Sequence, residues 1–282
     1  MMDFVYIVKK SEVNEDLRYS LRSIAKFYPD HKIWIVGYKP SWVQNVNYIP
    51  VKQTKDKWKN SVLNIQTACT NENISDNFIL MNDDFFCIKP ILPLETVCNA
   101  NLGKLTTSVK IHNKHNSKWH KAFKLVNDLL KKINVDEPNY DYEAHLPLQI
   151  NKEKYLEVMN LSEVQDFIKS KEILHKRTLY KNYDKAKESM SLSSDIKITQ
   201  TLDDSYQRVK ICGWLSVFDG QVRNPKFNRL NTILRTNFPY KCKYEVGYDP
   251  NRINPILENT EIVLSAKKIP DKSKGRDRFL HF

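Results

Sequence analysis

The sequence predicts an α/β fold in which helices flank a mostly parallel sheet, followed by a helical C-terminal part. Short apolar runs alternate with amphipathic stretches from the N-terminus onward, and this order is typical of βαβ units with parallel strands. The apolar runs show no alternation, which indicates strands buried on both faces. The chain has 282 residues, of which 41% are hydrophobic, enough for one large domain with a real core.

The first half of the chain supplies the expected sheet. Asn14 can cap the first helix, and Glu15 and Asp16 suit the positive end of its dipole. Pro29 ends this helix, because proline lacks the backbone donor that a helix needs. The expected strands are Phe4–Val8, Lys32–Val36, Tyr48–Val51, Phe78–Phe86 and Lys104–Lys110, and the expected helices are Asn14–Tyr28 and Ser61–Cys69.

The second half is predicted to be mainly helical. One helix starts in the lysine-rich stretch before Leu125 and continues through Leu130, and Asn151–Ile173 is helical with a second start at Ser162. The serine-rich segment Asp184–Asp204 indicates a lid or insertion. A strand is expected at Val209–Asp219, a helix at Phe227–Asn237, and a basic, weakly ordered tail at Lys267–Phe282.

Composition narrows the function classes. The longest apolar runs fall short of the 18 residues that a membrane span requires. The five cysteines are odd in number and show no close pairing, which favours reduced thiols in a cytoplasmic setting. No glycine-rich phosphate loop occurs among the 6 glycines. A net charge of +12 suggests a polyanionic partner, either nucleic acid or the diphosphate of a small substrate.

Two adjacent carboxylates, Asp83 and Asp84, follow a short run of four apolar residues. Carboxylates at the end of a buried strand are costly unless a cation pairs with them, and hard divalent ions prefer such oxygens. Open α/β sheets bind ligands at the carboxyl ends of their strands. We therefore expect Mg²⁺ or Mn²⁺ at this position, holding phosphate oxygens; the alternative is a turn with solvated carboxylates.

Further candidate residues lie on both sides of this pair. Arg18 and Arg22 could hold a diphosphate, although an exposed pair bridged to acidic neighbours is the alternative. Asn60 and Asn64 lie at the front of a helix, where phosphate binds readily. In the segment from Asp141 to Pro147, Glu143 is a candidate base, and His145 a metal ligand or proton carrier.

The stretch from Lys110 to Lys124 is dense in lysine and histidine. Its lysines could neutralise nucleic-acid phosphates and its aromatic residues could stack on bases; the alternative is a solvated helix start. The residues with this candidate role are Lys114, Lys118, Trp119 and Lys121.

Several segments together resemble Stealth-type sugar-phosphate transferases. Asn14–Ile24 is similar to their N-E-L-R-Y-S-L-R-S-I segment, and Asn60-Ser61 with Phe78–Phe86 is similar to their N-S and F-I-Y-F-N-D-D-F-F segments. His145-Leu-Pro147 with Arg177 resembles their H-x-P and R block, and Phe238–Glu245 resembles their closing F-P-x-x-S-x-F-E. The four segments occur in the family's order.

The resemblance implies a nucleotide-sugar-dependent transferase on a GT-A-like sheet with a divalent metal. It points to Asp83 and Asp84 as metal-site residues, and to a pocket made by Arg18, Arg22, Asn60, His145 and Arg177. On this basis residues 1–150 form the nucleotide-sugar-binding core, residues 151–266 complete the catalytic domain on the acceptor side, and residues 267–282 form the tail. The family's T-W-V-D-G segment is replaced here by Val8–Glu12.

The leading prediction is a cytoplasmic, metal-dependent glycosyltransferase that uses a nucleotide-sugar, with a UDP-sugar as the expected donor. The expected acceptor is polyanionic, and DNA with hydroxymethylated bases, extruded from the duplex for reaction, is the best candidate. One alternative is transfer of sugar-1-phosphate to a surface polysaccharide. The other is a non-catalytic nucleic-acid-binding protein on a transferase fold.

Overall fold

The computed structural model describes residues 2–185, 190–193, 195, 197, 211–217, 222 and 228–246. Residues 1–248 form one compact unit, and residues 249–282 are a separate unit. The expected basic tail and the acid expected at Asp219 lie outside the described residues. The proposed division of the chain at residues 150 and 266 stays a prediction.

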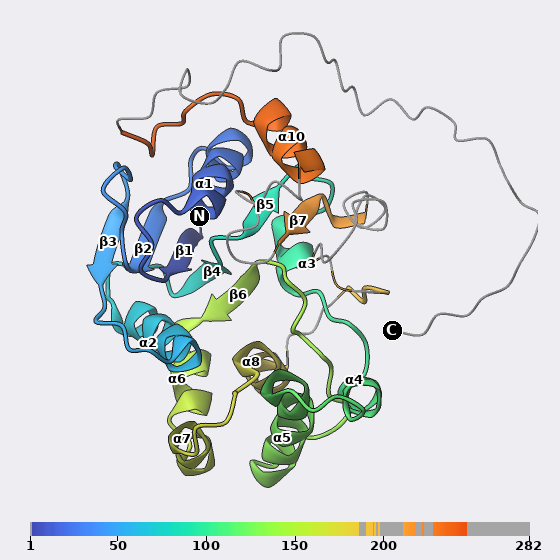
Figure 1. The fold of residues 1–282 in the computed structure, drawn as a ribbon. Coiled ribbons are helices and arrows are strands. Elements are labelled where there is room, and N and C mark those ends of the chain that lie inside the picture. The colour runs from blue at the N-terminus through green and yellow to red at the C-terminus, as the bar shows by residue number, and fades with distance from the viewer. Residues whose placement is uncertain are drawn as a thin grey trace, which may run out of the picture. The chain divides into compact units, whose positions relative to one another are not determined.

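The central sheet has five strands in the order β3-β2-β1-β4-β6 (Figure 1). Four of them are parallel, and only β6 runs antiparallel, to β4. This arrangement confirms the expected α/β fold with a mostly parallel sheet. The strands are β1 (Asp3–Val8), β2 (Ile33–Gly37), β3 (Asn47–Pro50), β4 (Asn77–Met81) and β6 (Leu148–Asn151).

The central strands are buried on both faces, as their unbroken apolar runs predicted. Alternate residues of β1 enter different cores. Phe4 and Tyr6 pack with helix α1 (Glu15–Phe27), whereas Val5 packs with residues of helices α2 (Lys57–Thr70) and α6 (Lys152–Met159). Figure 1 shows α1 and α2 on different sides of the sheet. The apolar side of α1 therefore packs against β1.

Helices flank this sheet, and α4, α5, α6, α7 and α8 form the lower part of the view in Figure 1. Helix α8 packs against both α5 and α6, so the helical part shares a core with the sheet. The described helices are α1 (Glu15–Phe27), α2 (Lys57–Thr70), α3 (Leu94–Cys98), α4 (Leu105–His112), α5 (Lys118–Lys132), α6 (Lys152–Met159), α7 (Ser162–Lys169), α8 (Lys176–Asp184) and α10 (Asn228–Asn237).

The single strand expected at Phe78–Phe86 is two strands. After β4, the chain leaves the sheet at the polar residues Asn82–Asp84 and then forms β5 (Phe85–Cys87). Strand β5 pairs antiparallel with β7 (Trp214–Ser216), with Phe86 opposite Leu215. The acidic pair is therefore held between two short buried strands, and a distant part of the chain lies beside it.

One local prediction was wrong, and one strand was missed. The strand expected at Lys104–Lys110 is helix α4, because Leu105 and Ser108 are buried at helical spacing although β-branched residues lie between them. Strand β6 was missed, since four residues are too few for a clear period. The helical segment expected over Asn151–Ile173, with a second start at Ser162, contains α6 and α7, and α7 begins at Ser162. None of the described helices is long and apolar enough to cross a membrane.

Candidate active site at the carboxyl end of β4

The acidic pair lies at the edge of the sheet where parallel strands end. Strands β1 and β4 are neighbours and run in the same direction, so the residues that follow them meet there. Asn14, which caps α1 after β1, donates a hydrogen bond from Nδ2 to Oδ2 of Asp83 at 2.8 Å. Asp83 is half-buried, whereas Asp84 is only 7% exposed.

Two polar groups partly compensate for the burial of the Asp84 carboxylate. The Ser216 hydroxyl donates to its Oδ2 at 3.3 Å, and the Lys197 ammonium lies 3.9 Å from the same oxygen. Burial raises the pKa of Asp84, while the charges of Lys197 and His145 act in the opposite direction. A site that keeps a carboxylate in such surroundings is well suited to accept a cation.

His145 is held by a residue that the sequence analysis did not single out. Asp195 accepts from His145 twice, at 3.0 Å from the backbone N–H and at 2.5 Å from ring atom Nδ1. Burial opposes ionisation of Asp195, but these contacts prevail and lower its pKa. Because Nδ1 is engaged, Nε2 is the ring atom left for a metal or a substrate. Asp195 lies in the segment expected to be a lid, where no pattern marks it.

Arg177 positions the segment that carries His145. Its guanidinium donates to the backbone oxygens of Tyr142, at 3.2 Å, and Leu146, and its Cζ lies 5.8 Å from the centre of the Phe85 ring. Arg177 is 9% exposed. The structure therefore places this predicted pocket residue next to the site, with its donors directed to backbone rather than left to a phosphate.

Glu143 caps a helix. Its Oε1 accepts from the backbone N–H of Thr178 at 3.2 Å and from the Thr178 hydroxyl at 3.1 Å, in the first turn of α8. The buried His175 imidazole lies 3.3 Å from Oε2. Burial alone would raise the pKa of Glu143, but His175 and nearby cations lower it to about 2. A carboxylate with this pKa is a weak base, so the geometry favours a structural role over the predicted catalytic one.

We expect Glu143→Gln to lower the free energy of unfolding by about 3 kcal/mol, because it leaves the His175 charge buried without a partner. The Glu143 carboxylate stabilises the folded state fully above its usual pKa of 4.5. This stabilisation is lost as pH falls towards the folded-state pKa of about 2. The pKa of His175 is raised despite its burial. Protonated His175 therefore stabilises the folded state fully below its usual pKa of 6.5, and this stabilisation is lost as pH rises through the raised pKa.

The effect of Glu143→Gln should therefore be largest between about pH 4.5 and 6.5, and smaller in alkaline buffer, where His175 can be neutral. Denaturant unfolding at pH 5.5 and pH 8.5 measures the difference. Glu172→Gln, at an exposed surface pair with Lys118, is the matched control. Equal losses at both pH values would refute the ion-pair explanation.

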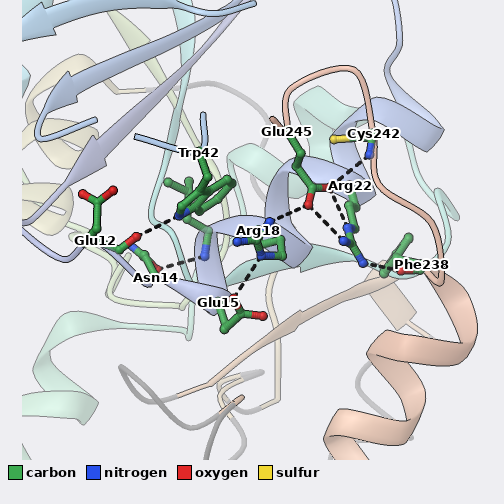
Figure 2. A network of polar contacts seen from close by, with 10 residues as sticks. Glu12, Asn14, Glu15, Arg18, Arg22, Trp42, Phe238, Cys242 and Glu245 are labelled. Carbon is green, nitrogen blue, oxygen red and sulfur yellow. Dashed lines mark hydrogen bonds and ion pairs between the residues drawn. The ribbon is translucent and has the colours of Figure 1, made fainter. Parts of the chain in front are cut away.

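Arg18 and Arg22 are buried in a charge cluster with Glu245 (Figure 2). Arg18 Nη1 donates to Glu245 at 2.7 Å, and Arg22 donates to both oxygens of that carboxylate at 2.7 and 2.9 Å. Arg22 also donates to the backbone oxygen of Phe238 at 3.0 Å. Both guanidiniums are thus directed to the C-terminal end of the described chain, and we place them in the scaffold rather than on a diphosphate.

The two predicted asparagines differ in their surroundings. Asn60 exchanges hydrogen bonds with Thr54 and braces the loop before α2. Asn64 is 3% exposed, and its Oδ1 has no hydrogen-bond partner among the described residues. It lies beside Gly37, where φ is +113° and a Cβ would be only 2.3 Å from the Val8 oxygen. Only glycine fits this approach between the ends of β1 and β2.

The candidate nucleic-acid residues lie on the α4–α5 hairpin. Lys114, Lys118 and Lys121 are exposed, as phosphate binding would require. Trp119 is half-buried, and its ring packs edge-on against Phe123 at 5.0 Å and His175 at 5.2 Å between centroids. The ring is therefore already used in packing, which leaves it less available for base stacking than the sequence suggested.

Asp83 and Asp84 are the residues that could hold a divalent ion together with substrate. Among the described residues, no group of three or more His, Cys, Asp and Glu side chains forms a complete metal cage. Mg²⁺ and Mn²⁺ commonly need only one or two carboxylates, with phosphate oxygens and water as the other ligands. Asp83 and Asp84 supply such a pair, and the burial of Asp84 favours an incoming cation.

Comparisons with known proteins show similarity to glycosyltransferase structures. The galactosyltransferase LgtC, solved with donor and acceptor sugar analogs, has a TM-score of 0.48 at 10% identity over 83% of this chain and 96% of its own. The bifunctional glycosyltransferase WbbM has a TM-score of 0.46 at 11% identity over 78% of this chain and 46% of its own. GlyE from Streptococcus pneumoniae has a TM-score of 0.41 at 11% identity, over 86% and 65%.

Similarity at this level assigns no activity to this chain. No protein-family model and no curated protein matches the sequence. The resemblance to Stealth-type transferases therefore stays a prediction, and the roles of the site residues rest on their own chemistry.

Proposed function

We propose that this chain is a metal-dependent glycosyltransferase that moves a sugar from a nucleotide-sugar, with a UDP-sugar as the expected donor, to an acceptor hydroxyl. The observation that carries the proposal is the acidic pair at the carboxyl end of β4. Asp84 is buried there, with the Ser216 hydroxyl at 3.3 Å and the Lys197 ammonium at 3.9 Å among its partners. Such a carboxylate is costly in a scaffold and useful in a cation site.

Asp83 and Asp84 would hold the ion, whose charge would stabilise the diphosphate that leaves the sugar. The acceptor oxygen forms a bond to the anomeric carbon, and the bond from that carbon to the diphosphate breaks. His145 is the candidate group for the acceptor proton, because Asp195 engages Nδ1 and leaves Nε2 as the reactive atom. Arg177 keeps the His145 segment in place through its two backbone oxygens.

The direct test incubates the wild-type chain with UDP-glucose, UDP-galactose and UDP-N-acetylglucosamine, with Mn²⁺ or with EDTA. We expect at least one donor to release UDP in the presence of Mn²⁺ only, and to raise the melting temperature under the same conditions. Free UDP is the expected product even without acceptor, through slow hydrolysis. If no donor is bound or cleaved in the presence of Mn²⁺, the proposal fails.

Asp195→Asn should lower kcat by about a hundredfold while leaving the KM for the donor nearly unchanged. The variant removes the charge that orients the His145 ring and leaves the acidic pair intact. Steady-state kinetics with a saturating metal measures both constants. Asp128→Asn, at an exposed position on α5, is the control. A change confined to KM would indicate that His145 contacts the donor rather than the acceptor.

For the acceptor, we propose a polyanion, with hydroxymethylated DNA as the first candidate. The net charge of +12 and the exposed lysines Lys114, Lys118 and Lys121 support this choice. The test incubates donor and enzyme with hydroxymethylated or plain DNA, followed by digestion and mass analysis of the nucleosides. Mass gain on the modified base supports the DNA acceptor, and no gain with any active donor removes it.

The product separates this proposal from two others. Release of UMP with a new phosphodiester would indicate sugar-1-phosphate transfer to a polysaccharide, as the resemblance to Stealth-type proteins suggests. Salt-sensitive DNA binding without turnover of any donor would indicate a non-catalytic nucleic-acid-binding protein.

A further inference from the structure

A polar cavity of about 320 Å³ lies at the other end of β4 from the candidate active site. Asn77 begins β4 and pairs in register with Asn151, the last residue of the edge strand β6. Because β4 runs from Asn77 towards Asp83, the cavity lies at the amino end of the strand. The lining residues that matter are Asn77, Asn99, Gln149, Asn151, Lys181 and Asp184.

Side-chain amides dominate the lining. Asn151 donates from Nδ2 to Asn77 Oδ1 at 3.1 Å, and Asn99 donates from Nδ2 to Gln149 Oε1 at 3.4 Å. The Oδ1 atom of Asn99 has no hydrogen-bond partner among the described residues. Asn151 Oδ1 also accepts from the Lys154 backbone N–H at 3.0 Å, and Gln149 Nε2 donates to the Met2 sulfur at 3.5 Å. Each amide has two N–H donors and two acceptor lone pairs, so capacity remains beyond these contacts for the hydroxyl groups of a ligand.

The charges at the cavity balance. The Lys181 side chain is 2% exposed, and its Nζ lies 3.6 Å from Oδ2 of Asp184. Lys154 and Glu153 add one further charge of each sign. An anionic ligand would meet Asp184 and Glu153 as well as the two lysines, so this arrangement favours a neutral polar ligand.

The cavity is preorganised and small. The Tyr180 hydroxyl accepts from the Asn151 backbone N–H at 2.8 Å and donates to Asp184 at 3.3 Å, which fixes the lining on α8 against β6. Ligand pockets range from about 300 to 1,000 Å³, so this one is at the lower end. A volume of about 320 Å³ suits a single sugar ring better than a nucleotide.

We propose that this cavity is a binding site for one neutral sugar ring, held through its hydroxyl groups by the amides of Asn77, Asn99, Gln149 and Asn151. The site is separate from Asp83 and Asp84 and requires no transferase activity. It would hold a free monosaccharide or the end of a neutral glycan chain.

The test is saturation-transfer NMR on the full chain with glucose, galactose, mannose and N-acetylglucosamine at millimolar concentration. We expect at least one sugar to bind, with affinity lowered about tenfold by Gln149→Leu and lost in Asn77→Tyr, which fills the cavity from an exposed position. Asn73→Tyr, in the exposed turn before β4, should bind like wild type. Melting temperatures confirm that each variant is folded.

No binding of any of the four sugars overturns the proposal, and so does equal binding by folded Asn77→Tyr. Inorganic phosphate binding that disappears in Asn77→Tyr would instead show an anion site. UDP release measured on the same samples keeps this question separate from the proposed function. Turnover without sugar binding refutes only the cavity site, and sugar binding without turnover refutes only the transferase.

Discussion

Asp84→Asn is expected to abolish turnover of the nucleotide-sugar and to leave the protein at least as stable as wild type. The amide keeps the shape of the side chain and removes the charge that would hold the cation. Loss of an electrostatic group that acts on the leaving diphosphate should lower kcat by about a thousandfold. Steady-state UDP release with saturating Mn²⁺ measures this loss.

Stability should respond in the opposite sense because the Asp84 carboxylate is 7% exposed and its pKa is raised by burial. A group with a raised carboxyl pKa in the folded state favours folding when protonated and opposes it when ionised at neutral pH. The neutral amide removes that opposition. We therefore expect the metal-free melting temperature of Asp84→Asn to equal or exceed that of wild type.

Addition of Mn²⁺ with the nucleotide-sugar should reverse this order, because only the wild-type chain gains stability from a bound ion. Asp128→Asn, on the exposed face of α5, should behave like wild type in all three measurements. A variant that retains activity, or one that melts much earlier than wild type, would show that Asp84 is a scaffold residue.

The parallel strands and the position of the acidic pair could be predicted from the sequence because both depend on local patterns. Unbroken apolar runs predicted buried parallel strands, and polarity at the end of β4 marked Asp83 and Asp84. Helix α4 was wrongly expected to be a strand, since the burial of Leu105 and Ser108 outweighed the propensity of the residues between them.

The residues that contact His145 and Asp84 could not be predicted from the sequence, because they come from distant parts of the chain. Asp195 reaches His145 across fifty positions, and Ser216 reaches Asp84 through the pairing of β7 with β5. No local period marks either residue. Arg18 and Arg22 show the same limit: their spacing marks a shared helix side, but only the fold shows that Glu245 lies opposite them.

Glu245→Gln is expected to lower the free energy of unfolding by about 3–5 kcal/mol, which is about 10 °C in melting temperature for a chain of this size. Glu245 is 1% exposed and neutralises two buried guanidiniums at 2.7 Å (Figure 2). The amide would remove the carboxylate charge that both arginines contact, although Arg18 also contacts Glu15 at 3.0 Å. Arg18 also stacks over Trp42 at 4.0 Å, so its displacement would disturb the neighbouring loop.

The loss of stability should extend beyond the charge cluster because the Glu245 segment also forms backbone hydrogen bonds with the loop after β2. Val246 donates to the Trp42 backbone oxygen at 2.8 Å, and Gln44 donates from its backbone to Tyr244 at 3.0 Å. Two of the segments that resemble Stealth-type sequences, one around Arg18 and the other ending in Glu245, therefore meet as a structural clamp. Their pairing needs no ligand to explain it.

The pH dependence identifies the cause of the loss. Burial opposes ionisation of Glu245, but hydrogen bonds and charges from Arg22 and Arg18 prevail and lower its pKa. Its contribution is therefore complete above the usual pKa of 4.5 and is lost as pH falls through the folded value. Wild type and Glu245→Gln should differ most at neutral pH and converge in acid, whereas exposed Glu172→Gln should follow wild type throughout. A neutral-pH difference below about 1 °C would mean that the clamp contributes little to stability.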